Sequence, residues 1–222
     1  MRNRPMTSFD DEFYRDILAG LAVYEDSAFL RDILTTLSRH QEAGIAVGLN
    51  RNQMASKRWL VDTLHATCGG RYGTIVVLGG WIGVLGAVLL HDRRFAIERI
   101  VSVDVDPGCA DVSRSLNATH VAHGRFEART ADMRELDYAA DAADLLINTS
   151  CEHVHDFGRW YARVPDGQRL VLQSNDYVAV REHVNCVADL AAFRAQAPMR
   201  DVAFAGERTL RRYTRFMLIG RK

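Results

Sequence analysis

A glycine-rich turn and an aspartate that follows about 25 residues later have the spacing of a nucleoside site. The segment Gly73-Thr-Ile-Val-Val-Leu-Gly-Gly-Trp-Ile-Gly83 is an apolar run that ends in glycines, and Val101-Ser-Val-Asp104 is a second apolar run that ends in an acid. Glycines allow the backbone to approach a ligand, and a carboxylate at the end of the neighbouring strand can accept hydrogen bonds from two ribose hydroxyls. We therefore expect a nucleoside to bind between Gly79 and Asp104.

Polar side chains also follow two later apolar runs. Asn148 ends the first run, with Glu152 and His153 shortly after it, and Tyr177 follows the second. Asn148 can both donate and accept hydrogen bonds, and Glu152 and His153 are candidate general bases. The Tyr177 phenol can hold an amine or face a cation. The alternative interpretations are that residues 149–152 cap the next helix and that residues 175–177 form a turn that satisfies its own backbone.

We expect neither a metal site nor a cysteine nucleophile. His153 and His155 should point apart at a helix start, and the sequence places no third ligand beside them and Asp156. Cys151 and His153 are near in sequence but should not face each other on a helix. The cysteines are far apart and form no C-x-x-C pair, which indicates reduced thiols in a cytoplasmic protein: Cys68, Cys109, Cys151 and Cys186.

Composition excludes several classes of partner. The 222 residues include 28 basic and 28 acidic side chains, so we expect neither nucleic acid nor an anionic membrane surface as a partner. Apolar residues make up 48%, which is enough for a sizeable core. The polar N-terminus shows no signal peptide, and the longest apolar run, 75–90, is shorter than a membrane span. We expect a cytoplasmic protein that acts on a small molecule, with its oligomeric state open and a homodimer as one option.

Alternating strands and helices must position these residues. Helical periodicity is expected at 9–21, 27–42 and 52–66, and Gly44 and Gly48 should break the chain between the last two helices. From Gly73 the pattern predicts strands at 74–79, 99–104, 125–130, 143–148 and 168–174, and helices at 82–91, 107–118, 153–163 and 187–196. Asp106 should cap the helix that begins at Pro107. The strands are continuously apolar, as in a parallel sheet that is covered on both faces.

The chain should end in a hairpin. Two strand-like runs, 201–205 and 211–220, are joined by residues 206–210 alone, so the last strand should be antiparallel to its neighbour. Four arginines near this hairpin are expected to form a solvated strand face: Arg208, Arg211, Arg212 and Arg215.

A dinucleotide-binding turn would read G-x-G-x-x-G, and the turn at 79–83 does not. With its glycine turn, Asp104 and C-terminal hairpin, the chain resembles the class I S-adenosylmethionine-dependent methyltransferases over roughly residues 70–222. The resemblance implies an α/β fold with a Rossmann-like seven-stranded sheet, mostly parallel, whose last strand is antiparallel and inserted beside the fifth. Helices should cover both faces. It also implies an N-terminal helical lid, 1–70, and a cofactor-binding domain, 71–222.

The resemblance assigns roles at the first two strands. Gly79, Gly80 and Gly83 would let the backbone meet the methionine part of S-adenosylmethionine. Trp81 replaces the family's middle glycine and either faces the sulfonium or packs between helix and sheet. Asp104 would hold the ribose hydroxyls, and Val105 would flank the adenine.

The remaining roles lie on later strands and on the lid. Asp132 and Met133 match the positions that meet the adenine edge through a side-chain acceptor and a backbone N–H, and Asn148 matches the position that faces the reacting group. Gln53 or Lys57 could meet the cofactor's carboxylate, although a lysine on a helix surface is commonly only solvated. Two residues before Gly79 the family often has an acid, and this chain has Val77 there.

We expect an enzyme that uses S-adenosylmethionine, without a metal, on a small molecule. The first hypothesis is methyl transfer, in which Asn148 and Tyr177 orient the acceptor and His153 or Glu152 removes a proton. The alternative keeps the cofactor but lets its own amine attack Cγ, which releases methylthioadenosine and closes azetidine-2-carboxylate. A binding module without activity and a nicotinamide oxidoreductase are further options, although Trp81 would obstruct the phosphate-cradling turn of the latter.

Overall fold

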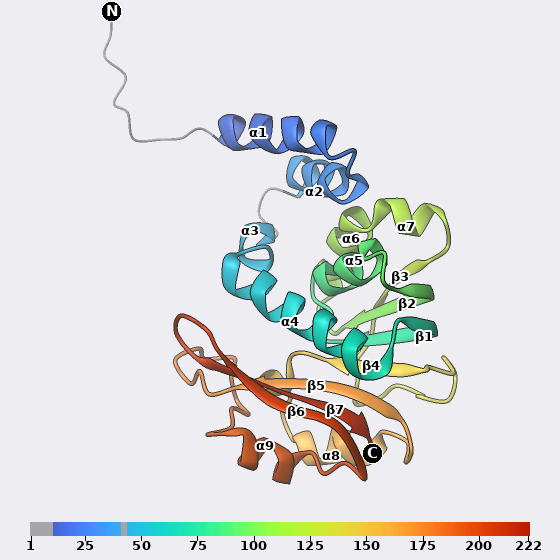
Figure 1. Ribbon diagram of the computed structural model, residues 1–222, viewed down its shortest axis with the longest axis vertical. Coiled ribbons are helices and arrows are strands. Elements are labelled where there is room, and N and C mark those ends of the chain that lie inside the picture. Colours follow the sequence, from blue (N-terminus) through green and yellow to red (C-terminus); the bar gives the residue numbers. More distant parts are fainter. Residues whose placement is uncertain (1–10, 41–43) are drawn as a thin grey trace, which may run out of the picture.

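The computed structural model describes residues 11–40 and 44–222, which contain a seven-stranded sheet with helices on both faces (Figure 1). The strands are β1 (Arg71–Leu78), β2 (Ala96–Asp104), β3 (Phe126–Thr130), β4 (Leu145–Asn148), β5 (Arg169–Asn175), β6 (Asp201–Thr209) and β7 (Thr214–Arg221). Their order is β3-β2-β1-β4-β5-β7-β6, and β7 is antiparallel to both neighbours. The predicted sheet, with its last strand inserted beside the fifth, is confirmed.

The strand register brings the predicted site residues to one edge of the sheet. β1 lies between β2 and β4, and Leu78 pairs with Val103 on one side and with Asn148 on the other. The segments that follow these three parallel strands therefore emerge side by side. Because the strand order reverses at β1, a crevice forms there, as in other open α/β sheets.

Apolar side chains alternate along β1 and fill a core on each side of the sheet. On one face, α4 (Arg51–Cys68) and α5 (Val84–His91) pack Leu60, Leu64 and Leu89 against Ile75 and Val77. On the other face, α8 (Phe157–Arg163) and α9 (Leu190–Gln196) bury Trp160 and Phe193 among side chains such as Leu172. Both layers fix the position of β1 and of the turn that follows it.

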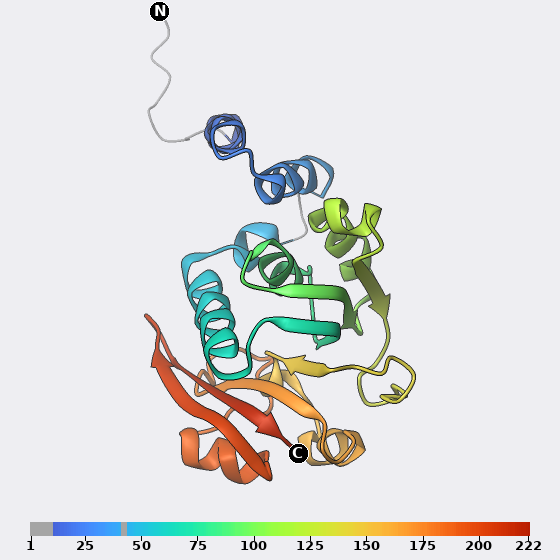
Figure 2. The same cartoon turned by 45° about the vertical axis from the view of Figure 1, so that its right-hand side comes forward.

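The first two helices form a pair beside the parallel half of the sheet. α1 (Asp11–Tyr24) packs on α2 (Ala28–Arg39), and α2 contacts α6 (Pro107–Leu116) and α7 (Ala118–Ala122), as Figures 1 and 2 show. The Asp32 carboxylate fixes this contact by accepting bonds from Thr119 N at 3.0 Å and Thr119 Oγ1 at 3.1 Å. Within residues 11–40 and 44–222, the N-terminal residues on the crevice wall are Val47 of α3 (Ile45–Gly48) and Gln53 and Lys57 of α4.

Several predicted boundaries differ from the structure for local reasons. The helix predicted at 153–163 is divided into a 3₁₀-helix, η1 (Cys151–His153), and α8, because Asp156 between them has a φ of 54°. The helix predicted at 107–118 ends at Leu116 and gives way to α7, while Asp106 caps its start as predicted. A short helix, α3, fills the predicted break between Gly44 and Gly48.

At the C-terminus, β6 continues to Thr209, so the hairpin turn lies at 210–213 and not at 206–210. The ends of two predicted helices, residues 9–10 and 41–42, lie outside the described residues. Across residues 11–40 and 44–222, every helix is too short or too polar to cross a membrane.

Candidate functional site

A cavity of about 540 Å³ opens at the carboxyl ends of the central strands. Most of the predicted cofactor-binding residues lie on its wall: Gln53, Lys57, Gly79, Gly80, Trp81, Asp104, Val105, Asp132 and Met133. The predicted bases Glu152 and His153 line it as well, whereas Gly83, Asn148 and Tyr177 do not. The structure therefore gathers residues from both halves of the sheet and from α4 around one space.

Asp104 is fixed in place by the backbone. Its Oδ2 accepts the Trp81 N–H at 2.7 Å, and its Oδ1 accepts the Asp106 N–H at 3.0 Å. Each carboxylate oxygen has further lone pairs, so both can still accept a hydroxyl from a ligand in the cavity. Because two amide donors orient it, this carboxylate is pre-organised for a pair of neighbouring hydroxyls.

Trp81 keeps the backbone conformation of the glycine that it replaces. Its φ is 47°, and the glycines on either side of it in the turn, Gly79 and Gly83, have φ values of 61° and 78°. Non-glycine residues seldom adopt a positive φ. The indole lies against α3, since a Cβ added to Gly48 would come within 3.2 Å of Trp81 Cζ3. Trp81 thus lines the cavity and also packs against α3.

The adenine side of the predicted site contains one exposed apolar residue and one ion pair. Val105 is 66% exposed next to Asp104, so a flat ring placed there would remove apolar surface from water. Asp132 is paired with Arg134 at 2.6 Å, and this hydrogen bond holds the pKa of the Asp132 carboxyl below its usual value. A ligand amine would have to share Asp132 with Arg134.

Lys57 brings a basic group to the cavity from α4. Its Nζ donates to Gln53 Oε1 at 2.7 Å, and burial, with a smaller contribution from the Arg215 charge, lowers the pKa of Lys57 to about 7. At neutral pH a large share of these side chains is therefore uncharged. Lys57 lies on the cavity wall, and the sequence alone could not indicate that burial would lower the pKa of its amine.

Arg215 was wrongly predicted to lie on a solvated strand face. It is 6% exposed and lines the cavity, where Nη1 donates to Glu152 Oε1 at 2.6 Å. Asn175 Nδ2 donates to the same oxygen at 2.7 Å. Glu152 is therefore held as the partner of a buried guanidinium, an arrangement that disfavours its predicted role as a general base.

Asn148 and Tyr177 are not among the residues that line the cavity. Asn148 is fully buried, and its Oδ1 accepts the Ser150 N–H at 2.8 Å while its Nδ2 is 3.5 Å from Met133 Sδ. Tyr177 stacks on Tyr213 with ring centroids 5.6 Å apart. Asn148 thus contacts Met133 and Ser150, and Tyr177 contacts Tyr213.

His153 remains the best placed of the predicted bases. It lines the cavity, and partial desolvation lowers the pKa of the imidazole, which favours the neutral form. Its Nδ1 lies 3.1 Å from the Glu182 carbonyl oxygen, so the neutral ring carries its proton on Nδ1. Nε2 is then free to accept a proton.

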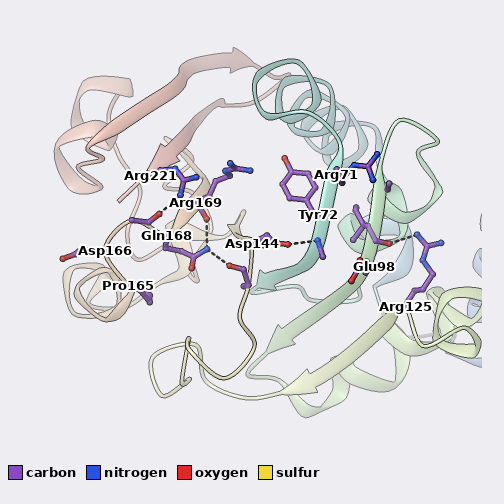
Figure 3. Close-up of a pocket in the computed structure, with 15 residues that line it drawn as sticks. Arg71, Tyr72, Glu98, Arg125, Asp144, Pro165, Asp166, Gln168, Arg169 and Arg221 are labelled. Atoms are coloured by element: carbon purple, nitrogen blue, oxygen red, sulfur yellow. Dashed lines mark hydrogen bonds between the residues drawn. The ribbon is translucent and has the colours of Figure 1, made fainter.

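A second cavity, of about 1000 Å³, lies at the opposite, amino-terminal edge of the sheet (Figure 3). Its polar side chains are largely engaged with backbone: Asp144 accepts the Gly73 N–H at 2.6 Å, and Arg125 donates to the Ile97 carbonyl at 2.9 Å. Gln168 likewise donates to the Ala143 carbonyl at 3.0 Å. These bonds hold loops together, and ligands of open α/β sheets bind at the other edge.

No protein-family model and no curated protein matches the chain. Solved structures share its fold. N-methyltransferase NodS from Bradyrhizobium japonicum WM9, in complex with S-adenosyl-L-homocysteine, matches with a TM-score of 0.61 at 10% identity, covering 88% of this chain and 97% of that chain. Geranyl diphosphate C-methyltransferase from Streptomyces coelicolor A3(2) matches with a TM-score of 0.56 at 16% identity, covering 76% of each chain.

A third similar structure extends over the N-terminal helices. A mutant of MtNAS in complex with S-adenosylmethionine matches with a TM-score of 0.55 at 14% identity, covering 95% of this chain and 77% of that chain. Together with the strand order, these likenesses show that the chain has the fold of the class I S-adenosylmethionine-dependent methyltransferases.

Proposed function

We propose that this chain binds S-adenosylmethionine in the cavity at the carboxyl ends of the strands and transfers its methyl group to a small molecule. The observation that carries the proposal is the Asp104 carboxylate, which lines the cavity and is oriented by the amides of Trp81 and Asp106. It suits a ribose diol, and exposed Val105 beside it suits an adenine ring. Proteins with the same fold hold S-adenosylmethionine or S-adenosyl-L-homocysteine.

In the proposed reaction an acceptor atom attacks the methyl carbon in line with the sulfur. The acceptor–carbon bond forms, the carbon–sulfur bond breaks, and the electron pair stays on sulfur, so that S-adenosyl-L-homocysteine leaves as a neutral thioether. Most of the acceleration would come from holding the two reactants together in a site with little water. The acceptor's proton would pass to His153 Nε2 or to the neutral form of Lys57, both of which line the cavity.

The position and pKa of Lys57 favour a second candidate function. The cofactor's own amine can attack Cγ only after it loses a proton, and a lysine with a pKa of about 7 on the cavity wall can accept that proton. The N–Cγ bond then forms, the Cγ–S bond breaks, and methylthioadenosine leaves azetidine-2-carboxylate behind. Both reactions use the same cofactor site and differ in which carbon is attacked.

Calorimetric titration with S-adenosylmethionine tests the shared premise. We expect Asp104→Asn to weaken binding by about 10- to 100-fold, because hydrogen bonds to a charged group contribute roughly 1.5–3 kcal/mol. Asp111→Asn is the matched control, since Asp111 is an exposed aspartate on α6 that pairs with Arg114. Equal affinity of wild type and Asp104→Asn would show that the ribose lies elsewhere.

Mass spectrometry after incubation with the cofactor alone distinguishes the two reactions. Methylthioadenosine together with azetidine-2-carboxylate would establish cyclisation and exclude methyl transfer as the main activity. An intact cofactor, turned over only when a small-molecule acceptor is added, would establish methyl transfer. A protein that fails to bind the cofactor in the calorimeter would refute both.

A further inference from the structure

Two histidines and a glutamate lie close together beside the cavity at the carboxyl ends of the strands. Glu152 and His153 come from η1, and His183 comes from the loop between β5 and α9. Each offers one ligand atom, and the three atoms lie within 4.8 Å of one another. The residues next to His153 in the sequence do not provide three ligands, and the third ligand, His183, comes from a loop 30 residues further along the chain.

Backbone hydrogen bonds fix the orientation of both imidazoles. His153 Nδ1 lies 3.1 Å from the Glu182 carbonyl oxygen, and His183 Nδ1 lies 2.6 Å from the Tyr177 carbonyl oxygen. A carbonyl only accepts, so in each neutral ring the proton is on Nδ1 and the lone pair is on Nε2. Histidines that bind metals are typically held in this way by a second partner on the other ring nitrogen.

The glutamate has one oxygen in use and one without a partner. Glu152 Oε1 accepts from Asn175 and Arg215, whereas Oε2 is buried and makes no hydrogen bond within the described residues. An acceptor buried without a partner is unfavourable, and a bound cation would satisfy it. The ligand set is thus two nitrogens and one oxygen, beside a guanidinium that holds the carboxylate in place.

We propose that Glu152, His153 and His183 bind a divalent first-row transition metal at the wall of the cavity. Two imidazoles and a carboxylate suit zinc, iron or cobalt, whereas magnesium and calcium prefer oxygen ligands alone. Ligand atoms lie about 2.0–2.2 Å from such an ion. His153 is exposed and His183 is partly exposed, which leaves both rings room to move.

The position of the site suggests what the ion does. Glu152 and His153 line the same cavity as Asp104, so an ion held there faces the space next to the cofactor. It would bind an acceptor oxygen and favour loss of its proton, with Lys57 on the same wall, and not the metal-bound His153, as the proton acceptor. This role rests on the proposed function, whereas metal binding itself does not.

Calorimetric titration of the chelator-treated full chain with zinc, in the absence of S-adenosylmethionine, tests the proposal. We expect one equivalent to bind, and His183→Ala and His153→Ala each to weaken binding by about tenfold or more, since even loss of an outer hydrogen-bond partner typically costs 10- to 100-fold. The matched control is His155→Ala, because His155 is exposed and lines the cavity but lies outside the cluster. Both histidine variants keep the buried Glu152–Arg215 pair, so they should fold.

Cobalt binding supplies an independent measurement. The cobalt-loaded protein should show the weak visible bands of nitrogen and oxygen ligands, and these should disappear in His183→Ala. An intense thiolate band would place the ion at a cysteine such as Cys186 and overturn the proposal, as would equal zinc affinity of wild type and His183→Ala. The zinc titration omits S-adenosylmethionine, so a protein that binds no zinc would not affect the conclusion drawn from Asp104→Asn. Equally, a negative result for Asp104→Asn would not affect the conclusion about zinc binding.

Discussion

At the scale of single residues, Lys57 is the group whose protonation most directly connects stability with the candidate site. The folded chain places its amine on a wall that also contains Arg215, away from much of the water that solvates it when the chain is unfolded. Burial and the neighbouring charge therefore lower its pKa from 10.5 to about 7. A group of this kind reduces stability whenever it must be charged.

We expect Lys57→Met to raise the free energy of unfolding at pH 7 by on the order of 1–2 kcal/mol, after allowance for residual solvent contact. The pKa of Lys57 is lower in the folded chain than in the unfolded chain. Above pH 10.5 the amine is neutral in both states and does not reduce the free energy of unfolding, whereas that free energy falls as the pH drops from 10.5 towards 7. The difference between the variant and wild type, measured by urea unfolding, should therefore narrow between about pH 7 and 10.

Lys57→Arg is the control for this prediction. Arginine keeps its charge over the whole pH range, so it should give neither the gain in stability nor the narrowing. A gain for Lys57→Met that stays constant with pH would mean that the amine is not titrating in the cavity.

Residues whose contacts are local could be predicted from the sequence, and those with distant partners could not. Asp104 and the glycine turn are bonded to each other through adjacent strands, so their spacing along the chain carried the information. Arg215 was misassigned because its partner, Glu152, lies on another element and nothing beside Arg215 in the sequence indicates burial. Asn148 was placed at the right strand end, but its side chain turns towards Ser150.

At the scale of secondary-structure elements, the contact between α3 and the turn after β1 determines how the N-terminal region meets the site. Gly48 lies where a Cβ would come within 2.7 Å of Ile82 Cδ1 and 3.2 Å of Trp81 Cζ3. The absence of a side chain on Gly48 lets the indole lie close to α3. The sequence indicated glycines at 44 and 48 as chain breaks, but their role as a surface for Trp81 depends on the tertiary fold.

We expect Gly48→Val to destabilise the protein by about 1–3 kcal/mol and to weaken S-adenosylmethionine binding, because the added methyl groups overpack against Trp81 and Ile82. Urea unfolding and calorimetry measure the two effects. Gly20→Val is the matched control, since a Cβ at Gly20 in α1 meets nothing within 4 Å among the residues that the structure describes. If the two variants unfold at the same urea concentration and bind the cofactor equally, α3 does not press on the turn.

At the scale of the whole molecule, a pair of histidines lies where the N-terminal helices join the sheet. His91 at the end of α5 and His120 in α7 have ring centroids 4.4 Å apart, and Phe29 of α2 lies 5.3 Å from His91. Each buried Nε2 lacks a hydrogen-bond partner within the described residues. The sequence predicted the helices but not this junction, because the α1–α2 pair was expected over the crevice and instead packs on α6 and α7.

The junction should make the protein sensitive to acid. Burial, together with the positive charges that His91, Arg125 and His123 can carry, lowers the pKa of His120 to about 4, and burial also lowers the pKa of His91 despite the nearby Asp32. Since the folded pKa of His120 lies below the unfolded value of 6.5, its contribution to stability is complete above that pH and is lost as the pH falls towards 4.

We expect His120→Gln to remove this dependence. Between about pH 7 and pH 5 the free energy of unfolding should fall by roughly 2 kcal/mol less in His120→Gln than in wild type. Urea unfolding at each pH measures the change, and the comparison between variants cancels the contribution of carboxylates elsewhere. His155→Gln is the control, because His155 is an exposed histidine that lines the cavity and lies outside this junction. Parallel stability profiles for wild type and His120→Gln would show that the pair accepts a proton without opening the junction between the helices and the sheet.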